Sequence, residues 1–267
     1  MIVGVLESRP SGETDFRIPP QEYRRAIYRC GACSVYLNAH AYDLDALYRG
    51  AYNRATYAGN LRVPYDRIMA LPEGKSDNKP RVRRVHEFCR ARGWEPAESP
   101  VLDVGSGLAV FAGELGKLGY PCYCLDPDPT SARHAVEFAG AVDAHAGTLE
   151  DYVPPCAPRL VTLNKVLEHV ADPRRLLRRA ASLIAKGGAL YIELPDGEAA
   201  LRAAPPPERE EFYIEHYTAF DPRSLAKLLD LCGLKNLETR RVFEPSGKYT
   251  IFAFAERSDP DLAQTRL

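Results

Sequence analysis

The chain contains 267 residues, of which 35 are Lys or Arg and 36 are Asp or Glu, so its formal net charge is −1. This balance of charge argues against a nucleic-acid-binding surface. A transmembrane helix needs about 18 consecutive apolar residues, and no apolar run in this sequence approaches that length. The seven cysteines are an odd number, which favours a reducing cytoplasm over a disulfide framework. We therefore expect a cytoplasmic protein with one main domain and no nucleic-acid or membrane partner. The composition leaves a homodimer open.

Residues 1–95 are rich in Tyr and Arg and are interrupted by several prolines. The elements that we predict in this segment are strands at 1–6 and near 26–30, and helices near 43–57, 64–71 and 79–92. We interpret the segment as an N-terminal cap and lid for the domain that follows.

Residues 96–257 alternate between strand-like and helix-like patterns. The predicted strands lie near 101–104, 120–125, 159–164, 188–194, 235–243 and 248–256, with a weaker one near 141–144. The predicted helices lie near 108–118, 130–139, 172–185 and 221–231. Such alternation predicts an α/β fold with a doubly wound, Rossmann-like sheet of seven strands covered on both faces. A turn at 244–247 joins the last two strands as a hairpin, so one strand is antiparallel. Residues 258–267 are predicted to be a tail.

The most informative stretch is Val-Leu-Asp-Val-Gly-Ser-Gly at 101–107, in which an apolar strand ends in a glycine turn before a helix. Gly105 and Gly107 allow a ligand to lie directly on the backbone around Ser106. The dinucleotide-binding fingerprint needs a further glycine at position 110, where this chain has Val110. Asp103 precedes the loop and would repel a pyrophosphate, so the pattern favours a cationic ligand. A glycine turn in another α/β domain is the alternative.

This stretch resembles motif I of the class I S-adenosylmethionine-dependent methyltransferases, whose cofactor carries a sulfonium and an ammonium. The resemblance implies three further cofactor contacts. Asp126, followed by Pro127 at the end of the next strand, would accept hydrogen bonds from the ribose hydroxyls. Leu149 would pack on the adenine ring, and Asn164 would contact the cofactor or shape its loop. A turn residue and a capped turn are the alternative interpretations of Asp126 and of the Leu149 region.

Residues 160–196 resemble the small-molecule methyltransferases of this class. The run contains Asn-x-Val-Leu-Glu-His-Val-x-Asp-Pro, then Lys-Gly-Gly, and finally Glu-Leu-Pro-Asp. The resemblance covers roughly residues 98–256. His169 within this run is either a structural residue close to the cofactor or a substrate contact.

A second polar cluster occurs at 212–220, Phe-Tyr-Ile-Glu-His-Tyr-Thr-Ala-Phe. It resembles the Tyr-x-Glu-His stretch of deoxysugar C-methyltransferases, with Tyr213, Glu215 and His216 at the matching positions. An imidazole is a natural base near neutral pH, so we predict His216 as the general base, oriented by Glu215, with Tyr213 on the substrate. The alternative is that His216 only packs the segment onto the sheet.

The deoxysugar enzymes also carry an N-terminal zinc knuckle made of two Cys pairs. This chain has a single pair, Cys30 and Cys33, and His40 would be only a third ligand where structural zinc normally takes four. We therefore predict a degenerate knuckle without metal, which weakens the inference of a sugar substrate. Tyr57, in the helix that resembles the family's lid, is predicted to cover the cofactor, and a core contact between the lid and the sheet is the alternative.

These features predict an S-adenosylmethionine-dependent methyltransferase that acts on a small polar metabolite, with a sugar or sugar nucleotide as one candidate. The modified atom would be oxygen, carbon or nitrogen. Two alternatives remain open: a same-fold enzyme that uses the cofactor for cyclisation or aminocarboxypropyl transfer, and a cofactor-binding partner protein without catalysis.

Overall fold

The computed structural model describes residues 1–42 and 60–258. The larger of its two sheets has seven strands in the order β10-β11-β8-β7-β4-β5-β6. These strands are β4 (Val101–Val104), β5 (Cys122–Asp126), β6 (Asp143–Ala146), β7 (Leu160–Asn164), β8 (Ala189–Pro195), β10 (Leu234–Phe243) and β11 (Tyr249–Arg257). β11 runs antiparallel to both of its neighbours, whereas the pairs from β8 to β6 are parallel. The predicted fold, with one reversed strand, is confirmed.

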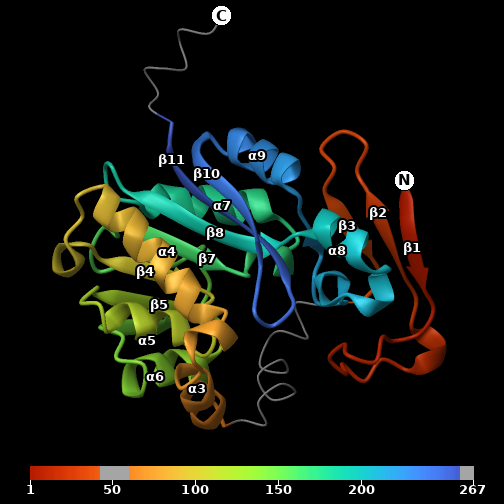
Figure 1. Ribbon diagram of the computed structural model, residues 1–267, viewed down its shortest axis with the longest axis horizontal. Coiled ribbons are helices and arrows are strands. Elements are labelled where there is room, and N and C mark those ends of the chain that lie inside the picture. Colours follow the sequence, from red (N-terminus) through yellow and green to blue (C-terminus); the bar gives the residue numbers. More distant parts are fainter. Residues whose placement is uncertain (43–59, 259–267) are drawn as a thin grey trace, which may run out of the picture.

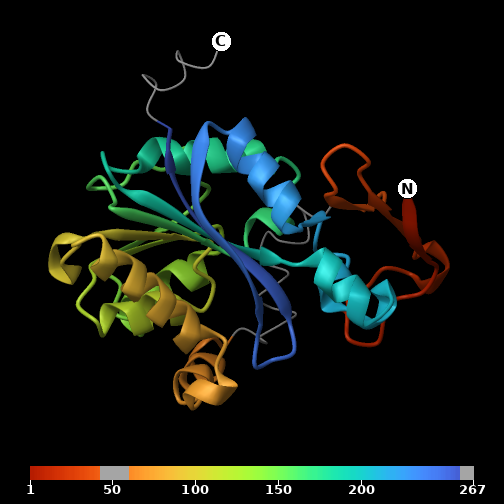
Figure 2. The same cartoon turned by 45° about the horizontal axis from the view of Figure 1, so that its top comes forward.

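Helices cover both faces of this sheet, as Figures 1 and 2 show. One face is covered by α7 (Pro173–Leu183) and α9 (Pro222–Leu231), whose apolar residues share a core with β7 and β8. The opposite face is covered by α3 (Arg62–Met69), α4 (Asn78–Ala91), α5 (Val110–Gly116) and α6 (Pro129–Glu137). Every residue of β8 is buried, which explains why its sequence is continuously apolar apart from Glu193.

Several helices begin where an Asp-Pro pair predicted that they would. The side chain of Asp172 accepts hydrogen bonds from the backbone N–H groups of Arg174 and Arg175, both at 3.1 Å. Asp221 forms a reciprocal capping box with Ser224 at the start of α9. Each cap satisfies backbone donors that the first helical turn leaves unpaired, while the proline that follows has no N–H to satisfy.

The smaller sheet is antiparallel and has the strand order β1-β2-β3-β9. Its strands are β1 (Ile2–Leu6), β2 (Arg25–Arg29), β3 (Tyr36–Ala39) and β9 (Thr218–Ala219). The short helix α8 (Gly197–Ala203) lies beside it (Figure 1). The sequence patterns did not predict β3, β9 or α8. A separate apolar core, which includes Ile27, Tyr36, Phe212 and Ile214, joins this sheet to the segment before β9.

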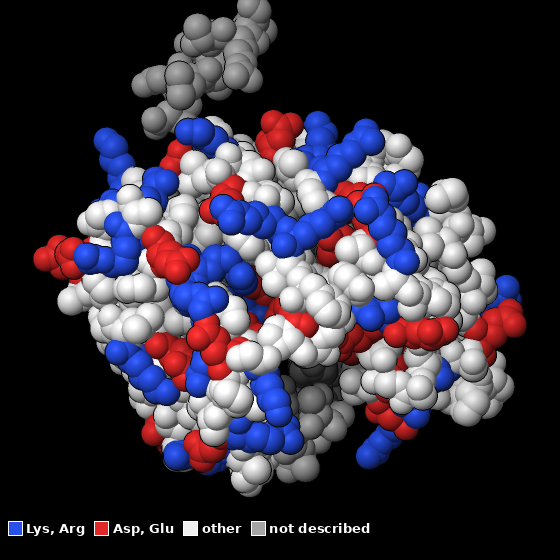
Figure 3. Space-filling view, viewed as in Figure 1, with Lys and Arg blue, Asp and Glu red and all other residues white. Residues whose placement is uncertain are grey.

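Side chains of both charge signs are mixed over the face shown in Figure 3. No helix within residues 1–42 and 60–258 is long and apolar enough to cross a membrane. The predicted lid helix near 43–57, including Tyr57, lies outside the described residues, as does most of the predicted tail. All seven cysteines are free, and the Cys30–Cys33 pair lies half-buried in the turn between β2 and β3.

Candidate functional site

The glycine loop after β4 is held against the end of β5. Gly105 donates its N–H to the Leu125 carbonyl at 2.7 Å, and its φ of +68° lies in the left-handed region that favours glycine. A Cβ at Gly105 would lie 2.7 Å from a methyl group of Val166, whereas a Cβ at Gly107 would have no atom of the described part of the chain within 4 Å. The loop is therefore closely packed at Gly105 and open at Gly107, where a ligand has room to approach the backbone.

Asp103 lies beneath this loop at the end of β4 and is only 2% exposed. Its Oδ1 accepts hydrogen bonds from Thr162 Oγ1 at 2.6 Å and from Asn164 Nδ2 at 3.0 Å. Burial raises the pKa of Asp103 to about 6, although both hydrogen bonds oppose this shift. The Oδ1 atom of Asn164 is buried and has no hydrogen-bond partner among the residues that the structure describes. Asp103 and Asn164 are thus hydrogen-bonded to each other, and their side-chain oxygens can still accept hydrogen bonds from a ligand.

The raised pKa of Asp103 predicts that cofactor binding depends on pH. The ionised carboxylate attracts a cationic ligand, and protonation below a pKa of about 6 removes this attraction. Lowering the pH from 7 to 5 should therefore weaken cofactor binding by about tenfold. Asp103→Asn should bind more weakly at pH 7 and show a smaller pH dependence. Calorimetric titration at several pH values measures both effects, and an equally steep pH profile in Asp103→Asn would contradict this role.

Asp126 ends β5 beside the glycine loop and is 8% exposed. Its Oδ2 accepts the N–H of Gly107 at 2.8 Å, and its Oδ1 accepts the N–H of Asp128 at 2.9 Å. These bonds hold the carboxylate next to the open position at Gly107, and each oxygen has a second lone pair for a ligand hydroxyl. Pro127, the next residue, is exposed. The ribose contact of Asp126 stays a prediction that this geometry allows.

The remaining predicted cofactor residues differ in their surroundings. Ser106 lies within the loop, and its N–H donates to the Leu125 carbonyl at 3.2 Å. Leu149 is 2% exposed and belongs to the core formed with α7, and its carbonyl accepts a hydrogen bond from Arg179. An adenine contact of Leu149 would therefore use the edge of a side chain that already packs in the core.

A cavity of about 180 Å³ lies at the carboxyl ends of β7 and β8, where Lys165 and Pro195 line it. Lys165, which lines this cavity, directly follows Asn164 in the chain. The other lining residues include Glu168, His169, Tyr213, Glu215, His216 and Lys248. The structure thus brings the predicted 212–220 cluster together with His169.

His169 and His216 meet in this cavity with their ring centroids 4.8 Å apart. The Nδ1 atom of His169 contacts the carbonyl of Glu215 at 2.9 Å, and the Nδ1 atom of His216 contacts the carbonyl of Glu211 at 3.1 Å. Because a carbonyl only accepts hydrogen bonds, each Nδ1 carries the proton and each Nε2 carries a lone pair. Burial lowers the pKa of His169 to about 4 and that of His216 well below its ordinary value. Both rings are therefore neutral near pH 7.

The two residues predicted to assist His216 have other neighbours as well. The contact at Nδ1 of His216 is the Glu211 carbonyl, not the carboxylate of Glu215. Glu215 is 7% exposed, and burial raises the pKa of its carboxyl to about 7. Tyr213 packs so closely on Gly12 that a Cβ at Gly12 would lie 2.1 Å from its hydroxyl oxygen. Tyr213 and Glu215 line the same cavity as His216, so a substrate contact by either remains a prediction.

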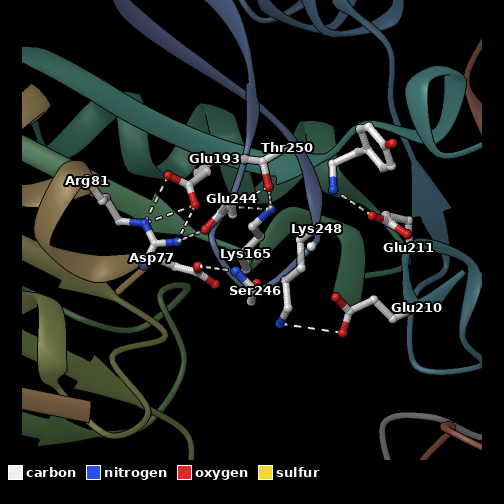
Figure 4. A network of polar contacts seen from close by, with 12 residues as sticks. Asp77, Arg81, Lys165, Glu193, Glu210, Glu211, Glu244, Ser246, Lys248 and Thr250 are labelled. Atoms are coloured by element: carbon white, nitrogen blue, oxygen red, sulfur yellow. Dashed lines mark hydrogen bonds and ion pairs between the residues drawn. The ribbon is translucent and has the colours of Figure 1, made fainter. Parts of the chain in front are cut away.

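A network of charged side chains connects α4 to the cavity wall (Figure 4). Arg81 of α4 forms a bidentate ion pair with Glu193 of β8. Although burial alone would raise it, the pKa of Glu193 is held well below its ordinary value by the Arg81 guanidinium. Lys165 donates to Thr250 Oγ1 at 2.5 Å, and Thr250 in turn bonds Glu244. The structure thus pairs Arg81 of α4 with a carboxylate of the sheet.

The segment that carries His216 is anchored by a buried ion pair that the sequence patterns did not indicate. Arg25 of β2 and Glu13 lie 2.7 Å apart, and both side chains are 0% exposed. Glu13 Oε1 also accepts the N–H of Ile214 at 2.7 Å, and Arg25 donates to the carbonyl of Phe212 at 2.5 Å. The smaller sheet therefore fixes the backbone on which Tyr213, Glu215 and His216 stand.

A family model described as a methyltransferase domain matches residues 75–239, which is more than half of the chain. The chain therefore belongs to this family. This match confirms the predicted class I S-adenosylmethionine-dependent methyltransferase family and, with it, S-adenosylmethionine as the cofactor.

Two curated relatives are similar to part of the chain. The chain is 34% identical over 112 residues to the ubiquinone biosynthesis O-methyltransferase of Xanthomonas axonopodis pv. citri (strain 306), a match that covers 40% of this chain and 46% of that protein. It is 34% identical over 115 residues to the enzyme of the same name from Methylobacterium sp. (strain 4-46), covering 39% and 46%. The chain thus spans about half the length of these relatives.

Two solved structures share the fold at low sequence identity. Magnesium protoporphyrin IX methyltransferase from Synechocystis PCC 6803 has a TM-score of 0.62 and 16% identity, with 80% of this chain and 100% of that chain covered. The 1,6-didemethyltoxoflavin-N1-methyltransferase of Burkholderia thailandensis has a TM-score of 0.60 and 17% identity, with 88% and 96% covered. These relatives do not support the predicted resemblance to deoxysugar methyltransferases, which included the N-terminal Cys pair.

Proposed function

We propose that this protein transfers a methyl group from S-adenosylmethionine to a small polar acceptor bound in the cavity beside Asn164. The observation that carries the proposal is the direct adjacency of two sites. Asn164 bonds Asp103 of the cofactor edge, and the next residue in the chain, Lys165, lines the polar cavity. Methyl transfer requires that an acceptor and the cofactor meet in line, and adjacent sites at the carboxyl ends of parallel strands satisfy this requirement.

The residues at the cofactor edge fit the proposed cofactor. The backbone is open at Gly107, the Asp103 carboxylate offers negative charge, and Asn164 Oδ1 is a buried acceptor without a partner in the described part of the chain. Asp126 would hold the ribose hydroxyls. When bound, S-adenosylmethionine supplies a methyl group on a positive sulfur, so the chain's own residues need only bind, orient and exclude water.

The cavity lining supports a polar acceptor. Its side chains include carboxylates, two lysines and the hydroxyls of Tyr213 and Tyr249, which suit an acceptor rich in hydrogen-bonding groups. The ubiquinone-biosynthesis relatives are named as O-methyltransferases, which favours an oxygen acceptor. A sugar or sugar nucleotide remains one candidate within this class.

His216 is the proposed proton acceptor for a hydroxyl or carbon nucleophile. Its Nε2 lone pair follows from the Nδ1 contact with Glu211, and the ring lines the cavity. Tyr213 and Glu215 would contact the substrate from the same segment.

Incubation with S-adenosylmethionine labelled in the methyl group, together with a metabolite extract, tests the proposal. Mass spectrometry should find one labelled methyl in a small product, with one S-adenosylhomocysteine formed per product. Aminocarboxypropyl transfer would instead release methylthioadenosine. The absence of any cofactor-derived product, from a folded protein that binds the cofactor, would favour a non-catalytic partner protein.

A further inference from the structure

We propose that Glu168, His169 and His216 form a binding site for a divalent transition-metal ion. Each of these residues offers one ligand atom, either an imidazole nitrogen or a carboxylate oxygen, and the three atoms lie within 4.8 Å of one another. No other group of this kind occurs among residues 1–42 and 60–258. The inference goes beyond the proposed function, because metal binding can be measured without cofactor or acceptor.

The carboxylate of Glu168 is the first independent observation that points to a cation ligand. The side chain is 0% exposed, and within residues 1–42 and 60–258 neither of its oxygens has a hydrogen-bond partner. A buried carboxylate is costly unless it is paired or coordinates a metal. Glu168 also lines the cavity, so an ion held there would be reached from the acceptor side.

The two histidines are oriented as metal ligands commonly are. Each Nδ1 contacts a backbone carbonyl, that of Glu215 for His169 and that of Glu211 for His216. This contact fixes the tautomer and the ring orientation and leaves the Nε2 lone pair for coordination, which is the usual outer-shell arrangement of a ligating histidine. The carbonyls belong to the 210–217 segment, whose backbone the Glu13–Arg25 pair holds in place.

The donor set selects the kind of ion. Two imidazoles and one carboxylate suit zinc and neighbouring first-row divalent ions, whereas magnesium and calcium prefer oxygen ligands alone. Three protein ligands also leave coordination positions open, as in catalytic rather than structural sites. The open positions would face the cavity, where an oxygen of the acceptor could occupy one of them.

The surrounding charges are compatible with a bound cation. The cavity is lined by four glutamates, Glu168, Glu210, Glu211 and Glu215, and by two lysines. Each lysine already has a carboxylate nearby, since Lys165 lies 3.6 Å from Glu244 and Lys248 lies 3.5 Å from Glu210 (Figure 4). In the metal-loaded protein, His216 is a ligand, and an acceptor hydroxyl bound to the ion would release its proton to solvent more readily.

Titration of metal-stripped protein with Co²⁺ tests the site directly. The Cys30→Ser/Cys33→Ser variant is the background, so that the thiol pair cannot bind the ion. We expect saturable visible absorption bands at one Co²⁺ per chain, without thiolate charge-transfer bands, and displacement of Co²⁺ by Zn²⁺. In this background, Glu168→Gln and His216→Ala should each weaken Co²⁺ binding. The loss of affinity should be larger than about 10–100-fold, which is the usual cost of removing a residue that only hydrogen-bonds to a metal ligand.

Matched controls separate ligation from general effects of charge and folding. Glu210→Gln removes the same charge from the same cavity wall without removing a ligand atom, and His86→Ala removes a half-buried imidazole from α4. Both should bind Co²⁺ like the background protein, and thermal melts confirm that each variant is folded. The proposal is overturned if the background protein shows no saturable binding of Co²⁺ or Zn²⁺. It is also overturned if folded Glu168→Gln and His216→Ala retain the background affinity.

Discussion

His216→Ala should lower the turnover number by roughly 10²–10⁴-fold while the affinity for S-adenosylmethionine stays nearly unchanged. The imidazole lines the acceptor cavity, and its Nδ1 contact with the Glu211 carbonyl leaves Nε2 available to the reaction. This nitrogen acts on the acceptor side, either as a proton acceptor or as a metal ligand. Its loss should therefore affect turnover and leave the binding of the cofactor nearly unchanged. Turnover with the acceptor found by the labelling experiment, and cofactor affinity by calorimetry, measure the two effects separately.

Asp126→Ala is the reciprocal variant for this prediction. It removes the carboxylate beside Gly107 and should weaken cofactor binding first, with a smaller effect once the cofactor is saturating. If His216→Ala retained full turnover, the base role would be abandoned. The protein would then be a catalyst by proximity, acting on an amine or thiol that is already nucleophilic, and His169 would be the next residue to test.

Glu13→Gln should lower the free energy of unfolding by about 3–5 kcal/mol, because it leaves the buried guanidinium of Arg25 without its charge partner. Both side chains of this pair are 0% exposed, so water cannot replace the lost interaction. The same substitution weakens the acceptor for the Ile214 N–H, so this amide should exchange with solvent faster. Urea denaturation and hydrogen exchange at Ile214 measure the global and local effects.

Asp15→Asn is a matched control in the same segment. Asp15 forms an ion pair with Arg9 at 3.6 Å, but its side chain is 63% exposed. Exposed pairs contribute about 0–1 kcal/mol, so this variant should differ little from the original protein. Equal destabilisation by Glu13→Gln and Asp15→Asn would contradict the anchoring role of the buried pair.

The seven-stranded sheet could be predicted from the sequence because each of its elements carries a local signal. Buried parallel strands read as short apolar runs, and Asp-Pro pairs mark helix starts such as Asp172. The glycine loop could also be predicted from the sequence, because the structure requires glycine at position 105. Gly105 has a positive φ, and there is no space there for a Cβ.

Strands β1 and β2 of the smaller sheet were predicted, but its pairing with β9 and the Glu168–His169–His216 cluster could not be, because both depend on contacts between distant segments. β9 is only two residues long and pairs with β3 from the N-terminal segment. Glu13 and Ile214 are separated by 201 positions, and no periodicity relates them. The proximity of Glu168 to His216 arises from the fold of the 210–217 segment onto the sheet, and no local sequence pattern indicates it.

Calorimetric titration of the folded protein with S-adenosylhomocysteine tests the central claim most directly, because it examines the cofactor edge without any knowledge of the acceptor. Saturable binding in the micromolar range, at one ligand per chain, is the predicted result. The absence of binding heat from a folded sample, with S-adenosylmethionine as well as with its demethylated product, would contradict the assignment of Asp103, Gly107 and Asp126 to the cofactor.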